Sequence, residues 1–434
     1  MTTSHPSKTT VDVLVIGGGI IGATVACELQ ASGRSVTLIE RGQPGHGCSF
    51  ANAGWLTPCF AMPLPQPGMF WKSIGWLLDP SSPLHIQPQL SPTFLRWMTH
   101  FLKSMNLKKM NESITVLTAL STYSLDFYQK LAVQSKAPIG FENRGLLMVS
   151  ATDGGLKAAN IEMRLMGERG IAGRSLTRDE ALGFEPTLKP IIKGGVFFPD
   201  ESQAEPYATT LAIMDEFVAL GGKSVPMTEA FDFEIKNGRI ASVETTEGIF
   251  DAELVVLATG AWSNSLARKL GSSIPVLGGK GYSMNIEMRE KKPQHPIMII
   301  EKKIAITPLL SAGGNSVRLA GTLELVDQDF SISSNRLRGI HRGAQEYLHF
   351  DADHPANDLS QVRKIWRGLR PCTPDGVPII GPSVRLQNLF YCTGHQLLGF
   401  QTAPGSARLA ADLILGRPTL TNPHPFRADR FERN

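Results

Sequence analysis

The chain has 434 residues, of which 42% are apolar and 19% are charged, so it can bury a large core and is not a disordered protein. Its 43 basic residues nearly balance its 39 acidic residues, and a net charge of +4 without a basic run excludes a nucleic-acid-binding protein. Five cysteines without a CxxC pair exclude a disulfide framework and a zinc knuckle, so we expect a reducing compartment and no metal site.

The chain begins with a short polar segment, MTTSHPSKTT, which lacks the apolar stretch of a secretory signal. No run of about 18 apolar residues follows, so no membrane-spanning helix is expected. The sequence therefore predicts a cytoplasmic protein. Its pI of about 8.7 is compatible with peripheral contact at the inner face of an anionic membrane.

The first predicted element is a buried strand, VDVLVIGGG at residues 11–19, which three glycines end. A helix follows and is closed on its C-terminal side by Gly33. The segment SVTLIE at 35–40 predicts a second buried strand. The three elements together form a βαβ unit of about 30 residues.

The rest of the chain divides into a Gly- and Pro-rich loop, an aromatic helical part and further mixed α/β stretches. We expect an ordered loop at 42–68, and then helices across 69–131 that a Pro-bearing segment at 79–92 separates. Strands at 141–150 and 194–199 are expected around charged helices at 153–184, followed by a helix after Glu205-Pro206. Strands across 223–258 with a hairpin at Asn237-Gly238, antiparallel strands across 275–330 and a helix at 335–350 complete the prediction. No clean linker divides the chain, so discontinuous domains are expected.

The βαβ unit carries a dinucleotide-binding fingerprint, Gly17-x-Gly19-x-x-Gly22, followed by Glu40 at the end of the second strand. Gly17 permits the tight turn, Gly19 lets the backbone approach a pyrophosphate, and Gly22 lets the helix pack on the strand. The helix N-terminus offers free N–H groups to phosphates, and Glu40 is placed to accept hydrogen bonds from a ribose.

The fingerprint alone does not separate FAD from NAD, but three other features favour FAD. A Gly/Ser/Asn-rich loop follows Arg41-Gly42, and the late strand VVLATGAW ends in glycine like the first strand. The segment NLFYCTGHQLLGF then predicts a strand, a Gly-rich turn and a helix N-terminus, whose positive end would stabilise a reduced flavin.

At this level of detail the sequence resembles the D-amino-acid oxidase superfamily of flavoproteins, and within it the bacterial D-amino-acid dehydrogenases. The motifs that carry the resemblance are the fingerprint with Glu40-Arg41, CSFANAG at 48–54, KGYS at 280–283, WRGLRPCTPDG at 366–376, and TGH at 393–395 with Leu398-Gly399. They are spread over nearly the whole chain.

The resemblance implies an α/β fold of the glutathione-reductase type: a Rossmann-like FAD-binding domain plus a substrate domain with a large antiparallel sheet. The expected FAD-binding domain comprises 11–68, 180–265 and 364–420, and the substrate domain comprises 69–179 and 266–363. The FAD is expected to be non-covalent. The residues expected to contact it are Gly17, Gly19, Ile20, Ile21, Gly22, Glu40, Arg41, Cys48, Ser49, Asn52, Ala53, Gly54, Trp55, Ala230, Gly260, Gly394, His395, Gln396, Leu397, Leu398, Gly399, Phe400 and Gln401.

Arg370 is the expected anchor of a substrate carboxylate, because arginine is a planar bidentate donor that stays charged. Tyr282 and His395 are the other candidate substrate-binding residues, although each also fits a merely packed position. No catalytic base is assigned, because flavin-dependent amine oxidation requires none. Relatives of the glycine-oxidase type carry a second cation where this chain has Leu397, which argues against glycine oxidase proper. Lys280 fits either a structural charge or a place near the flavin.

The predicted function is oxidative deamination of D-amino acids, including cyclic ones such as D-proline, with electrons passed to a quinone or another carrier. An oxygen-using oxidase of glycine, sarcosine or other small N-substituted amino acids, a flavin-binding electron-relay subunit and an NAD-binding protein remain as alternatives. The aromatic segment 70–105 fits core helices or a membrane-facing patch carrying Trp71, Trp76 and Trp97.

Overall fold

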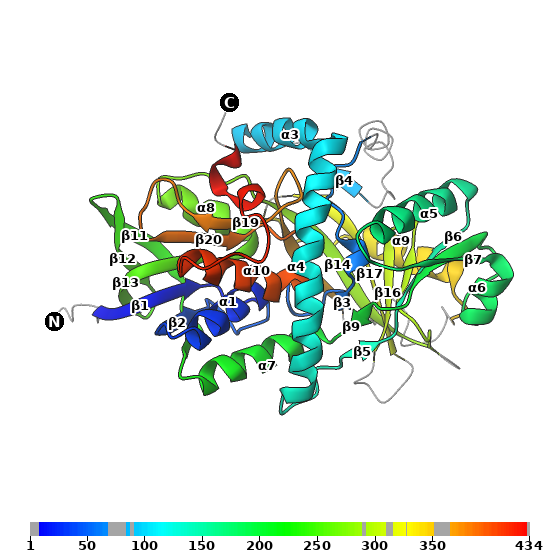
Figure 1. Cartoon of the computed structure of the whole chain (residues 1–434), viewed down its shortest axis with the longest axis horizontal. Helices are drawn as coiled ribbons and strands as arrows, with labels where there is room; N and C mark the ends of the chain where they lie inside the picture. The colour runs from blue at the N-terminus through cyan, green and yellow to red at the C-terminus, as the bar shows by residue number, and fades with distance from the viewer. Residues whose placement is uncertain are drawn as a thin grey trace.

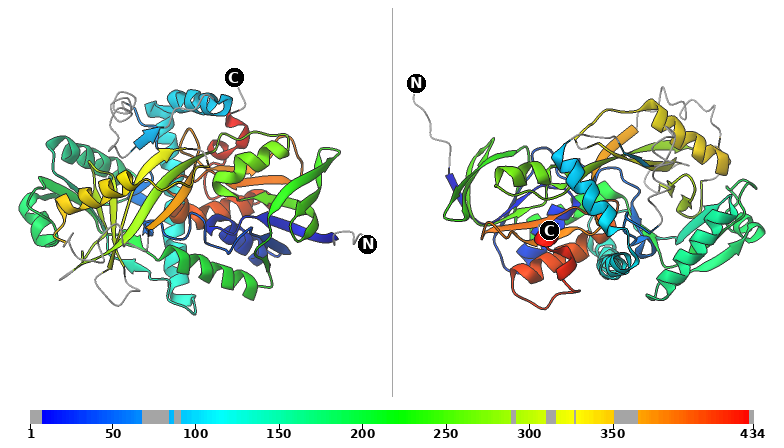
Figure 2. Two further views of the ribbon diagram at one scale, coloured as in Figure 1. Left: turned by 180° about the vertical axis from the view of Figure 1, so that it is seen from behind. Right: turned by 90° about the horizontal axis from the view of Figure 1, so that it is seen from above.

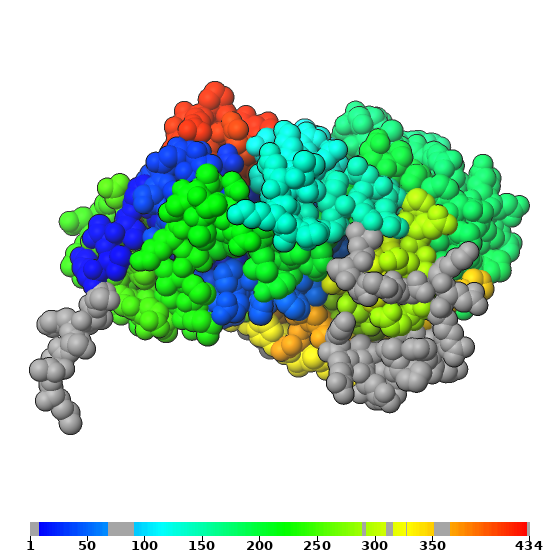
Figure 3. Space-filling view, turned by 90° about the horizontal axis from the view of Figure 1, so that it is seen from below, coloured from blue at the N-terminus to red at the C-terminus, as the bar shows by residue number. Residues whose placement is uncertain are grey.

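The computed structural model describes residues 8–67, 84–86, 91–288, 292–309, 316–326, 328–350 and 365–431. Two large sheets lie side by side, and the long helix α4 (Leu107–Gln134) crosses between them (Figure 1). The space-filling view in Figure 3 shows the cyan surface of α4 between the parts of the molecule that hold each sheet. None of the helices in the described ranges is long and apolar enough to span a membrane.

The first sheet has eight strands and contains the predicted βαβ unit. Its strands, in spatial order, are β10 (Lys223–Val225), β2 (Val36–Ile39), β1 (Lys8–Ile16), β13 (Gly248–Leu257), β12 (Arg239–Thr245) and β11 (Ala230–Lys236), with β20 (Leu389–Thr393) beside β13 and β19 (Ile379–Pro382) beside β20. β10, β2, β1, β13 and β20 pair in parallel. This is the strand arrangement of a doubly wound nucleotide-binding domain.

Both faces of this sheet are covered, which explains the uninterrupted apolar run of its first strand. Val13 and Val15 face a core made with helices α1 (Ile20–Ala31), α7 (Pro206–Ala219) and α10 (Gly399–Ile414). Leu14 and Ile16 face the opposite core, which includes α8 (Ser263–Lys269). A strand buried on both sides needs apolar residues at every position, so strict alternation is absent.

The second sheet has nine strands and is mostly antiparallel. Its order is β18 (Ile365–Cys372), β14 (Leu277–Glu287), β17 (Ser316–Leu325), β16 (Ile304–Pro308), β15 (Ile297–Ile299), β6 (Leu146–Ser150), β8 (Gly194–Phe198) and β7 (Arg174–Thr177), with β4 (Leu84–Ile86) beside β17. Helices α6 (Arg178–Phe184) and α9 (Ser334–Tyr347) pack on one face of the sheet. α5 (Asp153–Gly167) packs on the other face, which is turned toward the first sheet (Figure 2).

Short elements join the two sheets. A small third sheet contains β3 (Trp55–Leu56), β9 (Ser202–Gln203) and β5 (Glu142–Asn143). The 3-10 turns η1 (Pro58–Phe60) and η2 (Gly260–Trp262) follow β3 and β13, and η4 (His424–Phe426) and η5 (Ala428–Phe431) follow α10. Helix α3 (Pro92–Ser104) precedes α4 and packs its apolar side on the sheet region around Cys372.

The structure confirms the predicted α/β class with a large second sheet, which its structural neighbours share. The hairpin prediction is also confirmed, because Asn237 and Gly238 both have positive φ (52° and 71°), as a two-residue hairpin turn requires. β4 lies in the Pro-bearing stretch 79–92 that separates the predicted helices of 69–131, α3 and α4 confirm the helices after that stretch, and the remainder of 68–90 lies outside the described residues. The prediction of helices at 153–184 is wrong at the strand β7, whose partner β8 comes from a later part of the chain.

The two sheets also divide the chain differently from the expected domain ranges at two places. β8 falls in the range expected for the FAD-binding domain, and so does β18, yet both strands pair within the nine-stranded sheet. The sequence of a strand indicates how buried the strand is, but not with which strand it pairs. The sequence around β8 and β18 therefore could not predict which sheet they join. Trp97 is fully buried, stacks on Phe101 and donates its indole N–H to the carbonyl of Cys372 (2.9 Å), so it belongs to the core.

Candidate active site

A large cavity lies between the two sheets, with a volume of about 1290 Å³. Typical small-molecule sites have volumes of roughly 300–1,000 Å³, so this one has room for a dinucleotide and a further small molecule. Its wall includes the fingerprint loop, the 40–57 segment, the residues that follow β13, the middle of β14, Arg370 on β18 and the turn before α10. The cavity therefore lies at the carboxyl ends of the parallel strands, where such folds bind ligands.

The fingerprint glycines are required by close backbone contacts. Gly17 has a φ of 111°, and a Cβ at this position would lie 2.6 Å from the carbonyl oxygen of Ala258. A Cβ on Gly22 would lie 1.8 Å from the carbonyl oxygen of Gly17. These contacts leave no space for side chains, so the N-terminus of α1 comes close to the loop, and its N-cap residue, Gly19, has no side chain with which to cap it. Such a helix end suits a pyrophosphate.

Glu40 and Ser49 shape the loop around this helix end. Glu40 accepts hydrogen bonds from the backbone N–H groups of Gly18 (2.7 Å) and Gly42 (3.0 Å) and lines the cavity. Ser49 Oγ accepts from the N–H of Ile20 at 2.8 Å. The guanidinium of Arg41 lies over the ring of Trp262, 4.0 Å from its centroid. These contacts hold the residues that are predicted to bind the ribose and the phosphates along one side of the cavity.

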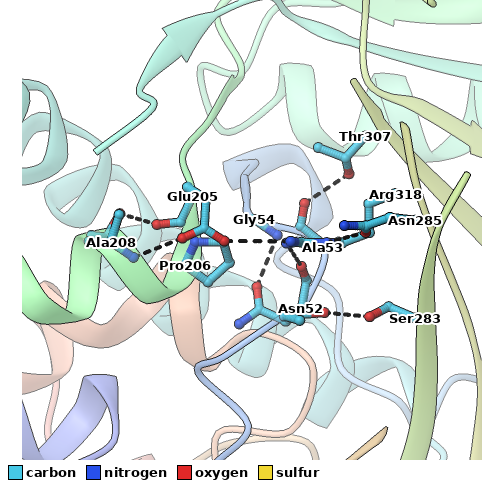
Figure 4. Close-up of polar contacts among 12 residues, drawn as sticks. Asn52, Ala53, Gly54, Glu205, Pro206, Ala208, Ser283, Asn285, Thr307 and Arg318 are labelled. Carbon is cyan, nitrogen blue, oxygen red and sulfur yellow. Dashed lines mark hydrogen bonds and ion pairs between the residues drawn. The ribbon is translucent and has the colours of Figure 1, made fainter. Parts of the chain in front are cut away.

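The loop at 51–54, called the flavin loop because the sequence predicts that it contacts the FAD, is bonded to the second sheet (Figure 4). Three side chains, each from a different strand, make these bonds. Each donates a hydrogen bond to one of three consecutive carbonyl oxygens: Ser283 Oγ to Ala51 (2.7 Å), Arg318 Nη1 to Asn52 (2.8 Å) and Thr307 Oγ1 to Ala53 (2.8 Å). The loop then turns at Gly54, whose φ is 73°. Because its carbonyl groups are bonded to the sheet, the loop is held against the edge of the cavity.

Arg318 also connects the sheet to helix α7. It is only 6% exposed, and its Nη2 lies 3.5 Å from the carboxylate of Glu205, which caps α7 through the N–H of Ala208 (Figure 4). Burial lowers the pKa of Arg318 and the charge of Glu205 raises it. A buried pair of this kind costs desolvation energy, which the backbone hydrogen bond to Asn52 helps to offset.

The turn before α10 closes the cavity on the C-terminal side. Gly394 and Gln396 both have positive φ (83° and 50°), and no side chain caps the N-terminus of α10. His395 is buried, and its Nε2 lies 3.1 Å from Ser406 Oγ. Its Nδ1 has no hydrogen-bond partner within the described residues. Burial lowers the pKa of His395 to about 3, so the ring is neutral at physiological pH.

Arg370 lies on β18, and its side chain passes over Gly281 to reach the cavity wall. Glycine is needed there, because a Cβ on residue 281 would lie 2.0 Å from the guanidinium. Its Nη1 donates to the carbonyl oxygen of Thr322 at 2.8 Å. Burial lowers the pKa of Arg370, and no carboxylate of the described ranges forms an ion pair with it. A guanidinium in this state is ready for an anionic ligand.

Thr322 adopts a strained conformation beside Arg370. Its φ is 61°, which is rare for a β-branched residue, and its Oγ1 has no hydrogen-bond partner among the described residues. The adjacent irregularity in the β14–β17 pairing, between Lys280 and Tyr282, accompanies this turn of the backbone. The strained residue directs its carbonyl oxygen to the guanidinium and thereby fixes the guanidinium's position.

Tyr282 and Lys280 have different surroundings although they lie close together on β14. Tyr282 lines the cavity, and its hydroxyl lies 3.4 Å from the carbonyl oxygen of Ser331; burial raises its pKa. Lys280 is 2% exposed and bonds to Asp329 at 2.6 Å, an interaction that lowers the pKa of Asp329 to about 2. Lys280 is therefore a buried cation whose partner, Asp329, is exposed, and it does not line the cavity.

The two cysteines nearest to Arg370 are protonated at neutral pH. Cys48 donates its thiol to the carbonyl oxygen of Leu369 at 2.7 Å, and burial raises its pKa to about 12. Burial also raises the pKa of Cys372 to about 12, and Cys372 is fully buried. Neither thiol has the low pKa that cysteine nucleophiles need.

The cavity brings together nearly all of the residues expected from the sequence. Among the expected cofactor and substrate residues, only Gly22 and Gly394 do not line it, and both lie directly beneath lining segments. The sequence did not point to Thr322, Thr307 or Arg318, because they are isolated polar residues on strands far away in sequence, and it gave no role to Ser283 of the KGYS motif. Only the sheet register brings them to the same place.

Comparison with known proteins agrees with this geometry. A family model described as "FAD dependent oxidoreductase" (DAO) matches residues 12–413, and the chain belongs to that family. It is an FAD-dependent oxidoreductase, and FAD is its cofactor. The glycine cradle and the helix N-termini of α1 and α10 at the cavity fit such a dinucleotide.

Among curated relatives, the chain is 34% identical over 409 residues to a D-amino acid dehydrogenase of Rhodopseudomonas palustris (strain HaA2), covering 93% of each chain. It is 32% identical over 411 residues to a D-amino acid dehydrogenase of Vibrio atlanticus (strain LGP32), covering 93% of this chain and 96% of the relative. Among solved structures, the fold is similar to glycine oxidase from Geobacillus kaustophilus, with a TM-score of 0.76, 24% identity and coverage of 97% and 99%.

Proposed function

We propose that the protein oxidatively deaminates D-amino acids, cyclic ones such as D-proline included, and passes the electrons to a quinone or another carrier. The unpaired guanidinium of Arg370 in the wall of the FAD cavity carries this proposal, because the carboxylate is the group that every amino acid presents. The relatives named D-amino acid dehydrogenase support the choice of substrate class.

The chain's own residues would bind and orient both the cofactor and the substrate. We propose that the FAD is non-covalent, held by the fingerprint loop, Glu40, the flavin loop at 51–54 and the N-terminus of α10. When bound, the flavin supplies the hydride acceptor, N5, for the Cα–H bond of the substrate. Arg370 would hold the carboxylate, and the surrounding apolar wall would exclude water.

His395 would serve as a neutral part of the wall. Its lowered pKa keeps the ring uncharged, and its bond to Ser406 fixes the orientation of the ring beside the end of α10. His395 therefore adds no positive charge to that of Arg370. Leu397, which is 50% exposed and lines the cavity, supplies no second cation. A single anchor suits substrates with one carboxylate.

The test is a panel of D- and L-amino acids assayed with an artificial dye acceptor, both aerobically and anaerobically. The proposal predicts turnover of D-amino acids without oxygen and without stoichiometric peroxide. Stoichiometric peroxide with glycine or sarcosine would favour an oxygen-using oxidase instead. Absence of turnover with every amino acid and acceptor would overturn the proposal and favour a flavin-binding relay subunit.

A further inference from the structure

The cavity extends beyond the nucleotide cleft as an arm across the nine-stranded sheet. One row of side chains forms its floor, and its members lie directly opposite one another on four neighbouring strands. The row consists of Ala320 on β17, Ala305 on β16, Met298 on β15 and Met148 on β6, and all four line the cavity. At about 4.8 Å between strands, the row spans roughly 14 Å.

The floor of the arm is apolar, and its side chains are smaller at one end than at the other. Ala305 and Ala320 are small and leave space close to the Arg370 end, whereas the two methionines form a flexible apolar surface farther along. Thr322, which holds the guanidinium, lies two residues from Ala320 on the same strand, or roughly 7 Å along it. A carboxylate bound by Arg370 would therefore leave its side chain at the beginning of the arm.

Helix α5 forms the wall at the far end, and one carboxylate on it faces the arm. Ala158 and Ala159 line the cavity with little bulk, and Glu162 lines it one turn farther along the helix. Glu162 is half-buried and has no hydrogen bond or ion pair with any described residue. Burial raises its pKa, and the charge of Lys303, on the turn between β15 and β16, lowers it.

We propose that this arm receives the side chain of the substrate and that Glu162 selects long, unbranched side chains that end in a cation, an ammonium or a guanidinium. A carboxylate that lacks a partner in a mostly apolar cavity is costly, and a cationic ligand removes that cost through a charge-assisted hydrogen bond. The apolar floor suits the methylene chain that must join the anchored carboxylate to such a cation. The proposal rests on the amino-acid substrate proposed above.

The test compares D-lysine with D-norleucine, which has the same carbon chain without the terminal amine. For the flavin-loaded wild-type protein, we expect kcat/KM to be about 10-fold or more higher with D-lysine. Glu162→Gln should lower kcat/KM for D-lysine by about 10–100-fold and leave D-norleucine within about twofold. Glu162→Asp should restore part of the D-lysine activity.

Two further variants separate a local effect from a general one. Glu168, at the end of the same helix, is exposed and does not line the cavity, so Glu168→Gln should leave both substrates unchanged. Lys303→Gln removes a competing cation and should increase kcat/KM for D-lysine. The flavin content of each variant, read from visible absorbance, verifies that it is folded and loaded.

A wild-type protein that oxidises D-norleucine as well as D-lysine overturns the inference and leaves the proposed function intact. So does a Glu162→Gln variant whose preference between the two substrates is unchanged. A loaded protein that oxidises no D-amino acid at all overturns the proposed function, and the inference falls with it.

Discussion

Replacing Arg370 by methionine should abolish most of the activity without unfolding the protein. The guanidinium makes one hydrogen bond to the carbonyl oxygen of Thr322 and forms no ion pair with a described carboxylate. Its charge is therefore available for a ligand. Arg370→Met keeps an unbranched apolar stem across Gly281 and removes the fork that would bind a carboxylate.

The expected loss follows from the number of bonds to the ligand. A bidentate carboxylate forms two charged hydrogen bonds worth about 1.5–3 kcal/mol each, so kcat/KM should fall roughly 10²–10⁴-fold. The fold loses about 1 kcal/mol for the hydrogen bond to Thr322 but no longer buries an unpaired cation, so the two effects nearly cancel. The melting temperature should shift by only about 2–4 °C.

The assay combines kcat/KM for the best D-amino acid, flavin content and thermal unfolding for wild type, Arg370→Met and Arg370→Lys. Lysine retains the charge without the planar fork and should give intermediate activity. An Arg370→Met variant with kcat/KM within tenfold of wild type would refute the role of anchor. A variant that loses its flavin and unfolds would show that Arg370 stabilises the fold instead.

Three further predictions concern the cofactor cradle and the buried imidazole. Gly22→Ala places a Cβ against the carbonyl oxygen of Gly17, so the purified variant should lack flavin absorbance, whereas Gly183→Ala, in open space, should retain it. Thr307→Val leaves a flavin-loop carbonyl without its donor and should weaken FAD binding to the apoprotein about 10-fold; an unchanged Kd would contradict this. His395, with its pKa lowered to about 3, takes up a proton more readily when unfolded, so the free energy of unfolding should fall as pH decreases below about 6.5. Urea unfolding at several pH values should show this slope, to which His395 contributes up to about 1.4 kcal/mol per pH unit, and His395→Gln should make it smaller.

The nucleotide-binding half of the site was predictable because its constraints are local. Gly17, Gly19 and Gly22 lie within six residues of one strand–turn–helix unit, so their spacing alone reveals them, although Gly17 meets Ala258 from a distant strand and only Gly22 meets its own unit. Glu40 follows at the end of the next strand, where parallel pairing places it beside the loop. The hairpin at Asn237-Gly238 is also local, because two residues determine the turn.

The substrate half was predictable only through resemblance, because it depends on sheet register. Arg370 meets Thr322 from a strand two positions away in the sheet, and no pattern in the sequence links the two residues. Glu162 reads as an ordinary charged residue on an amphipathic helix. Only the packing of α5 over the second sheet turns it toward the cavity.

The most direct measurement is a titration of the FAD-loaded protein with benzoate, a carboxylate without an oxidisable Cα–H bond, followed by visible absorbance of the flavin. A carboxylate held by Arg370 beside the flavin should produce a saturable spectral change in the wild-type protein. Arg370→Met should abolish this change, and the surface variant Arg385→Met should retain it. A wild-type spectrum that does not respond, or an equal response in Arg370→Met, would contradict the claim that FAD and an Arg370-bound carboxylate share the cavity.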